Sequence, residues 1–191
     1  MVHSTLPSRE DAWSILTEFT KSESLLKHAL AVEAVMRALA QAHGEDEQLF
    51  GLVGLLHDFD YEVYSEIGTH TIEGGRILKE RGFPDIVIRA IQSHVTENDI
   101  SRNSLLEKSI FASDELTGFV VAATLVRPEK DLSGQSPKSV MKKLKDKGFA
   151  KGVNRQEVYD GVAGLGVELA DYIQFIINAL KPKAEAIGLN P

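Results

Sequence analysis

The sequence contains no cysteine, so disulfide bonds and thiolate ligands are excluded, and a metal site would have to use histidine and carboxylate side chains. It also has no apolar run of the ~20 residues that a membrane-spanning helix requires. The segment from Met1 to Glu10 lacks the basic-then-apolar order of a secretory signal. These absences predict a cytoplasmic protein without a membrane partner.

Segments with strand periodicity and internal repeats are absent as well. Apolar residues instead recur every three or four positions, as between Leu25 and Leu39, which is typical of amphipathic helices. The 191 residues, of which 43% are hydrophobic and 26% charged, suit one globular domain. We therefore predict one all-α helical bundle over residues 1–191. Its core lies at about 22–126, and C-terminal helices at 136–187 pack on that core.

Local signals mark where the helices begin and end. Ser8, Asp46 and Ser104 are suited to N-cap positions, and Gly44 is suited to ending a helix. Pro84 is expected in the first turn of its helix. The predicted helices lie at about 9–19, 22–43, 46–58, 69–81, 84–94, 104–126, 138–147, 155–163 and 167–181.

Charge is distributed unevenly along the chain. The formal net charge of −7 argues against a general nucleic-acid binder. The segment from Lys138 to Lys151, however, carries six lysines against one acid, Asp146. A solvated helix face is the simpler explanation of this run, and contact with a substrate phosphate is the functional one.

Three positions suggest chemistry inside the bundle. His57 and Asp58 follow the apolar stretch Leu52–Leu56, and Asp114 interrupts an apolar helix. A carboxylate on a buried helix face costs several kcal/mol unless it is paired or bound to metal. Asp114 could also be a surface acid beside Glu115, and a lone His-Asp pair is common by chance. The two features together, preceded by a histidine on the second helix, favour a metal site.

The order His28, then His57-Asp58, then Asp114 resembles the HD superfamily of metal-dependent phosphohydrolases. The segment Gly54-Leu55-Leu56-His57-Asp58 is similar to the apolar helix that ends in the His-Asp pair of that family. The stretches His70–Leu78 and Ile88–His94 resemble its HDIG-type branch. Phe59-Asp60 replaces the Ile-Gly of that motif, which leaves the subfamily open.

The resemblance implies a divalent metal centre of one or two ions, with Mn, Fe, Zn, Co, Ni and Mg all compatible with such ligands. The implied ligands of a first ion are His28, His57, Asp58 and Asp114. A second ion would be held by His70 and His94 with a bridging Asp58, and His57 and Asp58 are the implied catalytic pair. If they are not ligands, His70 would be a helix cap and His94 a hydrogen-bonded histidine at a helix end. His3 and His43 are expected to be solvated.

The implied activity is hydrolysis of a small phosphoester, a nucleotide being one candidate, by metal-activated water. The sequence does not indicate which substrate is used, which group acts as general acid or which oligomeric state forms. The candidate contacts of the substrate phosphate are Arg76, Lys142 and Lys143, and also Lys145 and Lys151. The candidate general acids are Asp60, Glu62 and Glu66. Tyr61 and Tyr64 are candidates for the rim of the substrate pocket.

Two other functions fit the same residues. HD-type diiron oxygenases, such as myo-inositol oxygenase, are similar in ligand order and use dioxygen, so iron content and oxygen consumption would distinguish them. A non-catalytic, metal-binding sensor domain is the second alternative. A helical nucleic-acid binder is disfavoured by the net charge and by the lack of aromatic residues among the lysines.

Overall fold

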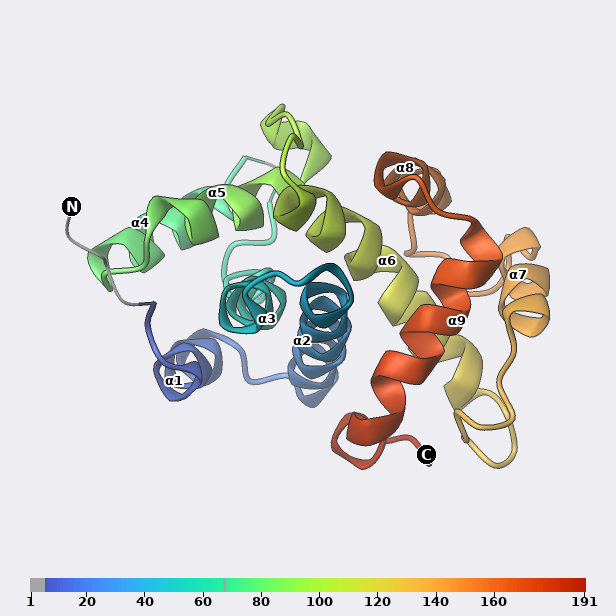
Figure 1. Ribbon diagram of the computed structural model, residues 1–191. Coiled ribbons are helices and arrows are strands. Elements are labelled where there is room, and N and C mark those ends of the chain that lie inside the picture. Colours follow the sequence, from blue (N-terminus) through green and yellow to red (C-terminus); the bar gives the residue numbers. More distant parts are fainter. Residues whose placement is uncertain (1–5, 67) are drawn as a thin grey trace.

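The computed structural model describes residues 6–66 and 68–191 (Figure 1). Within these residues the chain forms nine α-helices and three short 3-10 helices, and it has no β-strand. The all-α fold is therefore confirmed. The α-helices are α1 (Arg9–Phe19), α2 (Glu23–His43), α3 (Glu47–Leu56), α4 (Ile72–Glu80), α5 (Asp85–His94), α6 (Leu105–Leu125), α7 (Pro137–Lys145), α8 (Arg155–Leu165) and α9 (Leu169–Leu180).

Side-chain caps mark five of the nine α-helix starts in the described chain. The hydroxyl groups of Ser8 and Ser104 accept hydrogen bonds from backbone N–H groups three residues later, and each forms a reciprocal capping box. Asp46 accepts from two N–H groups at the start of α3. Gly44 ends α2 with a φ of 69°, a backbone conformation that glycine adopts without steric cost. The sequence signals therefore located these ends correctly.

Two helix starts differ from the prediction. Helix α4 begins at Ile72, not at Thr69 or His70, because Thr71 has a φ of 61° and interrupts the helical backbone. His70 consequently lies in the turn that precedes α4. Pro84 occupies the N-cap of α5 rather than its first turn.

Helices α2, α3 and α6 form the centre of the molecule. Figure 1 shows α2 and α3 side by side, almost end-on, with α6 running diagonally past them. Helix α5 contacts both α3 and α6, whereas α8 and α9 contact α6, and α9 also contacts α2. Buried hydrophobic side chains from all nine helices form one continuous cluster, which includes Met36, Phe50, Phe59 and Phe119. Burial of each such side chain contributes about 1.5–3 kcal/mol, so the core fixes the helix ends that carry polar groups.

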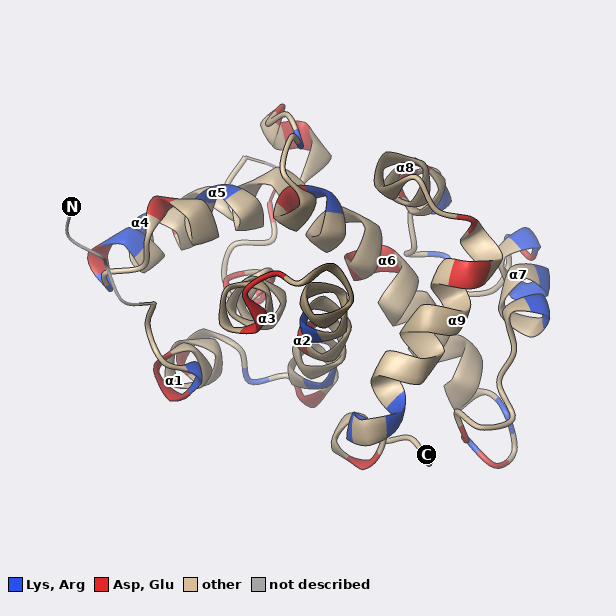
Figure 2. Cartoon of the chain, viewed as in Figure 1, with Lys and Arg blue, Asp and Glu red and all other residues tan. Residues whose placement is uncertain are grey.

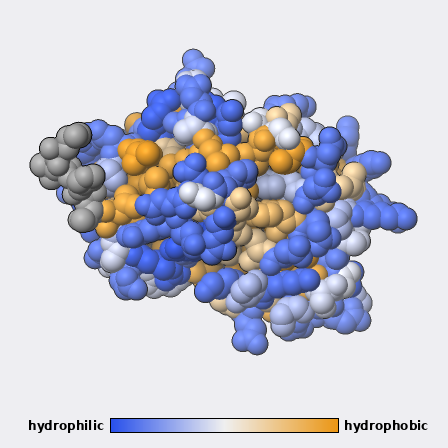
Figure 3. Space-filling view, viewed as in Figure 1, coloured by the Kyte–Doolittle hydropathy of each residue, from blue (hydrophilic) through white to orange (hydrophobic). Residues whose placement is uncertain are grey.

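The surface separates charge from apolar residues. The lysines of α7 gather at the right-hand edge of the molecule in Figure 2. In the space-filling view a band of hydrophobic residues crosses the upper middle of this face, between hydrophilic side chains (Figure 3).

No single helix of the described chain is long and apolar enough to cross a membrane. Only the pair Arg155–Leu165 and Leu169–Lys183 meets that test jointly, with a bend of 94° between them.

The close approach of α8 to α6 gives a stability test. A Cβ atom at Gly161 would lie 2.7 Å from the Cα atom of Ala112, whereas one at Gly164 would meet nothing within 4 Å. We expect Gly161→Ala to lower the free energy of unfolding by about 2 kcal/mol, since overpacking a fixed backbone contact forces the helices apart. The matched variant Gly164→Ala should leave stability unchanged or raise it by up to about 1 kcal/mol. Chemical denaturation measures both, and equal effects would contradict the tight α6–α8 contact.

Candidate metal centre

Five elements of the bundle meet at one point and bring together six polar side chains that are widely separated in sequence. The contributing positions are the first half of α2, the C-terminal end of α3, the turn before α4, the last residue of α5 and the middle of α6. The six residues are His28, His57, Asp58, His70, His94 and Asp114.

The first group joins α2, α3 and α6. The Nε2 atom of His28 is 3.0 Å from Oδ1 of Asp114 and 3.1 Å from Nε2 of His57. The same carboxylate oxygen is 3.3 Å from Nε2 of His57. One ligand atom from each of His28, His57, Asp58 and Asp114 lies within 4.8 Å of the others. Two imidazole nitrogens and two carboxylates that converge in this way could hold one metal ion.

The second group joins the turn before α4 to the end of α5. Oδ1 of Asp58 is 3.2 Å from Nε2 of His70 and 3.3 Å from Nε2 of His94. The other oxygen of Asp58 is 3.5 Å from Nε2 of His57, which belongs to the first group. Asp58 therefore lies between the two groups, where its two oxygens could bridge two ions.

Backbone carbonyl groups orient two of the imidazole rings. Nδ1 of His57 is 2.8 Å from the carbonyl oxygen of Gly54, and Nδ1 of His94 is 2.6 Å from that of Ile91. A carbonyl oxygen can only accept, so Nδ1 carries the proton in both rings. Each Nε2 atom consequently points at the centre, and in the neutral ring its lone pair could bind a metal ion.

The centre attracts positive charge strongly. Burial alone would lower the pKa of His57, but the negative charges of Asp58 and Asp114 outweigh it and raise that pKa to about 9. Burial acts against the charged form of Asp58, yet the facing histidines hold its pKa well below the usual range. Within the described chain neither carboxylate pairs with a lysine or an arginine. Asp58 and Asp114 are only 20% and 21% exposed, and carboxylates so largely removed from water without a fixed cation suit a site for metal ions.

A cavity of about 560 Å³ opens over the two groups. Its wall includes Tyr61, as expected for the rim, but not Tyr64, which packs against the core. Glu115 also lines it, and burial, followed by the charge of Asp114, raises the pKa of this carboxyl group to about 7. The sequence singled out Glu115 only as a neighbour of Asp114, because its position beside the cavity depends on how α6 is rotated.

Comparison with known proteins agrees with this geometry. Residues 25–118 match the family model described as the HD domain. The chain contains an HD domain. Five of the six converging residues lie on its helices or at a helix end, and His70 lies in the turn before α4.

The curated relatives extend well beyond this chain. Ribonuclease Y 2 of Levilactobacillus brevis is 31% identical over 97 residues, which are 50% of this chain and 18% of that protein. Ribonuclease Y of Staphylococcus epidermidis is 32% identical over 96 residues, with the same two shares. Ribonuclease Y of Aquifex aeolicus is 34% identical over 80 residues, which are 41% of this chain and 14% of that protein. The similarity therefore spans less than a fifth of each relative. No solved structure matches the chain.

The basic residues proposed for the phosphate lie away from the HD-domain cavity. Arg76 is exposed on α4 and forms ion pairs of 3.0 Å with Glu73 and 2.7 Å with Glu80. Lys143 lies over the ring of Phe149, 4.5 Å from its centroid. None of Arg76, Lys142, Lys143, Lys145 and Lys151 lines the cavity. The spacing in sequence did not reveal this, because it does not tell which way a helix face points.

The remaining candidates also have other surroundings. Glu62 accepts hydrogen bonds from the backbone N–H groups of Lys21 and Ser22, and Glu66 is exposed. Neither lines the cavity. His43 is exposed at the end of α2, and His3 lies outside the described residues.

Asp60 is buried and holds neighbouring groups of the HD-domain centre in place by hydrogen bonds, so it is not open to substrate. Its side chain is 0% exposed, and Oδ2 accepts from the N–H groups of Thr71 and Gly74 at 2.8 and 3.0 Å. Its Oδ1 atom lies 3.0 Å from Nδ1 of His70. Asp60 thus caps α4 and turns Nε2 of His70 toward Asp58. A carboxylate behind a ligating histidine is a common arrangement in metal sites.

This arrangement predicts a large loss of stability on truncation. We expect Asp60→Ala to lower the free energy of unfolding by about 3 kcal/mol, because it leaves two buried N–H groups without an acceptor. Glu66→Ala, in the same loop, should change it by less than about 0.5 kcal/mol. Urea denaturation compares the two variants, and a small effect at Asp60 would show that water replaces its carboxylate.

Proposed function

We propose that this HD-domain protein is a metal-dependent phosphohydrolase that cleaves a phosphoester with a metal-activated water. The observation that carries the proposal is the pair of His/Asp groups that share Asp58 beneath one cavity. The HD-domain match and the ribonuclease names of the relatives support phosphoester chemistry in general.

The ligands we propose are His28, His57, Asp58 and Asp114 for one ion, and Asp58, His70 and His94 for a second. The donor set fits divalent ions, because it contains only imidazole nitrogen and carboxylate oxygen and no sulfur. Bound divalent ions would lower the pKa of a coordinated water from ~15.7 toward ~7 and polarise the phosphoryl oxygen. The metal identity stays open among Mn, Fe, Zn, Co, Ni and Mg.

The protein side chains divide the remaining tasks. Backbone carbonyls hold His57 and His94 with Nε2 toward the centre, and Asp60 does so for His70. Among the described residues no lysine or arginine lines the cavity, so the wall offers a phosphate no fixed cation. We therefore assign the neutralisation of the phosphoester charge to the metal positions. Because the proposed nucleophile is a metal-activated water, the reaction would need no serine or cysteine nucleophile.

A small molecule is the substrate class we favour. Cavities of about 300–1,000 Å³ are usual for small ligands, and the cavity here is about 560 Å³. The chain is acidic overall, and the lysines of α7 do not reach the cavity wall. An RNA phosphodiester, which the names of the relatives suggest, is the competing substrate in the tests below.

Metal analysis tests the ligands directly. Protein purified without chelator and equilibrated with Mn²⁺ should bind close to two equivalents per chain. We expect His70→Ala to bind about one, because it removes a ligand of the second position only. The control His43→Ala removes an exposed histidine and should retain two. If the wild-type protein binds one equivalent of Mn²⁺ per chain and His70→Ala binds the same amount, the second metal site is contradicted.

Activity tests the reaction. We expect hydrolysis of small phosphomonoesters that is lost with EDTA and restored by Mn²⁺. His57→Ala should lower kcat/KM by more than about 100-fold, since loss of an outer-shell partner alone costs about 10- to 100-fold. His43→Ala should keep the wild-type rate.

Three outcomes would contradict this proposal. Cleavage of RNA without cleavage of monoesters would change the substrate class. Oxygen consumption by an iron-loaded protein that hydrolyses no ester would indicate a diiron oxygenase. Two bound metal ions with no turnover of any ester would indicate a non-catalytic sensor domain.

A further inference from the structure

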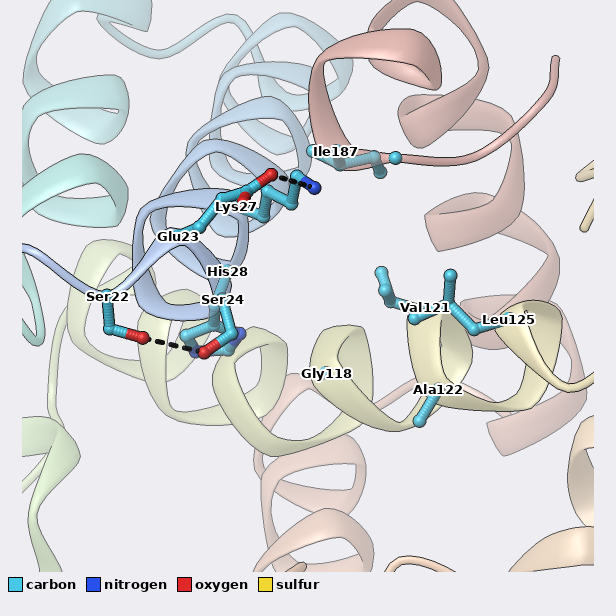
Figure 4. A pocket seen from close by; sticks show the side chains of 11 residues that line it. Ser22, Glu23, Ser24, Lys27, His28, Gly118, Val121, Ala122, Leu125 and Ile187 are labelled. Carbon is cyan, nitrogen blue, oxygen red and sulfur yellow. Dashed lines mark hydrogen bonds and ion pairs between the residues drawn. The ribbon is translucent and has the colours of Figure 1, made fainter.

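A second cavity adjoins the metal centre. It has a volume of about 670 Å³ and lies between the start of α2, the second half of α6 and the C-terminal turn, by which we mean the 3-10 helix Glu185–Ile187 and Gly188 (Figure 4). It shares His28 and Gly118 with the cavity over the metal centre. The two cavities are therefore neighbours that meet at the His28 imidazole ring and at Gly118.

Gly118 leaves space at this boundary. A Cβ atom added there would lie 3.5 Å from Cε1 and Nδ1 of His28, which is ordinary contact distance. The helix therefore does not need glycine to avoid a clash at this position. Glycine within a helix costs about 1 kcal/mol relative to alanine, and here it keeps the space beside the His28 ring open.

The walls of the two cavities differ in chemistry. The cavity over the metal centre is lined by five acids and three histidines, with Leu25, Val95 and Val153 among its apolar lining residues. Figure 4 shows that Val121 and Leu125 of α6 point toward Ile187 of the C-terminal turn, whereas Ala122 lies on another side of α6 in this view. All four residues line the cavity. Leu125 is 40% exposed, so a ligand that covers it gains the free energy of burying apolar surface.

The polar rim of the second cavity carries little net charge. Nζ of Lys27 is 2.6 Å from Oε1 of Glu23, and the hydroxyl groups of Ser22 and Ser24 are hydrogen-bonded to each other. Because its one lysine is already paired with an acid, this rim is poorly suited to a second phosphate. It is compatible with a neutral organic group that has an apolar face.

We propose that the second cavity holds the organic part of the substrate, and that the substrate is a phosphoester with a neutral, apolar body. The proposal rests on the function proposed above. The phosphoester lies over the metal centre, and the body passes Gly118 and packs against Val121, Ala122 and Leu125. The occupant follows from continuity, because His28 and Gly118 border both this cavity and the cavity over the metal centre.

The proposed metal ligands and the apolar wall of the second cavity lie in different parts of the sequence. The six proposed ligands lie within the HD-domain match at residues 25–118. The apolar wall consists of Val121, Ala122, Leu125 and Ile187, all of which lie outside that match. Substrate preference is thus assigned to residues that follow the HD domain.

Ala122→Phe tests the proposal by filling the second cavity. The measurement is the ratio of kcat/KM for 1-naphthyl phosphate to kcat/KM for glycerol phosphate, with Mn²⁺-loaded protein. We expect wild-type protein to prefer the naphthyl ester, and Ala122→Phe to lower the ratio at least about 10-fold, mainly through KM. The control Val126→Phe places the same ring at an exposed position beyond the cavity and should keep the wild-type ratio.

Two further measurements keep the test informative if Ala122→Phe does not fold or if the protein does not hydrolyse either ester. Leu125→Ser removes apolar wall instead of filling space, and its partly exposed position tolerates serine, so it should also lower the ratio. Calorimetric titration with 1-naphthylmethylphosphonate, which cannot be hydrolysed, should give a Kd at least about 10-fold weaker for Ala122→Phe than for Val126→Phe.

The outcomes separate the two proposals. An unchanged ratio and an unchanged Kd in Ala122→Phe and Leu125→Ser overturn the second-cavity proposal, while turnover of glycerol phosphate upholds the hydrolase. Phosphonate binding that depends on Ala122, without turnover of either ester, overturns the hydrolase and upholds the cavity as the site of the apolar group. Absence of both turnover and binding overturns both.

Discussion

Two carboxylates inside the bundle, Asp58 and Asp114, set the central physical constraint of this protein. Each faces imidazole nitrogens at 3.0–3.5 Å, and within the described chain neither meets a lysine or an arginine. Both side chains are about four-fifths removed from water (20% and 21% exposed), and a charge in such surroundings is costly unless it is compensated. The histidines of α2, α3, α5 and the turn before α4 must therefore stay close to these two residues. The packing that holds those elements together and the chemistry of the centre depend on each other.

Backbone groups at helix ends do much of the positioning. The carbonyl oxygens of Gly54 and Ile91, in the last turns of α3 and α5, fix the proton of His57 and His94 on Nδ1. Asp60 caps α4 and orients His70 with the same carboxylate. Groups at the helix ends, such as the Asp60 carboxylate, thus serve both the helix cap and ligand orientation, which links the stability of the fold to the precision of the site.

The two cavities give the site a polar end and an apolar end. All six converging His and Asp residues at the polar end lie within the HD-domain match, although Val153, Asn154 and Glu157, which also line that cavity, lie outside it. The apolar wall belongs to the end of α6 and to the C-terminal turn. Helix α6 joins them, because it carries Asp114 toward the metal centre and Val121 toward the second cavity, with Gly118 between. A proposed chemistry common to the family and a preference specific to this chain can in this way lie on one helix.

The sequence by itself determined the all-α class, most helix ends and six residues that meet in space. Caps such as Ser8 and Ser104 act within one helical turn, and apolar periodicity is local, so neither needs tertiary information. Only the tertiary structure decided that Asp60 is buried behind His70, that Arg76 and the lysines of α7 lie away from the cavity, and that Glu115 borders it. Those facts depend on the rotation and mutual placement of helices, which are set by packing between residues far apart in the chain.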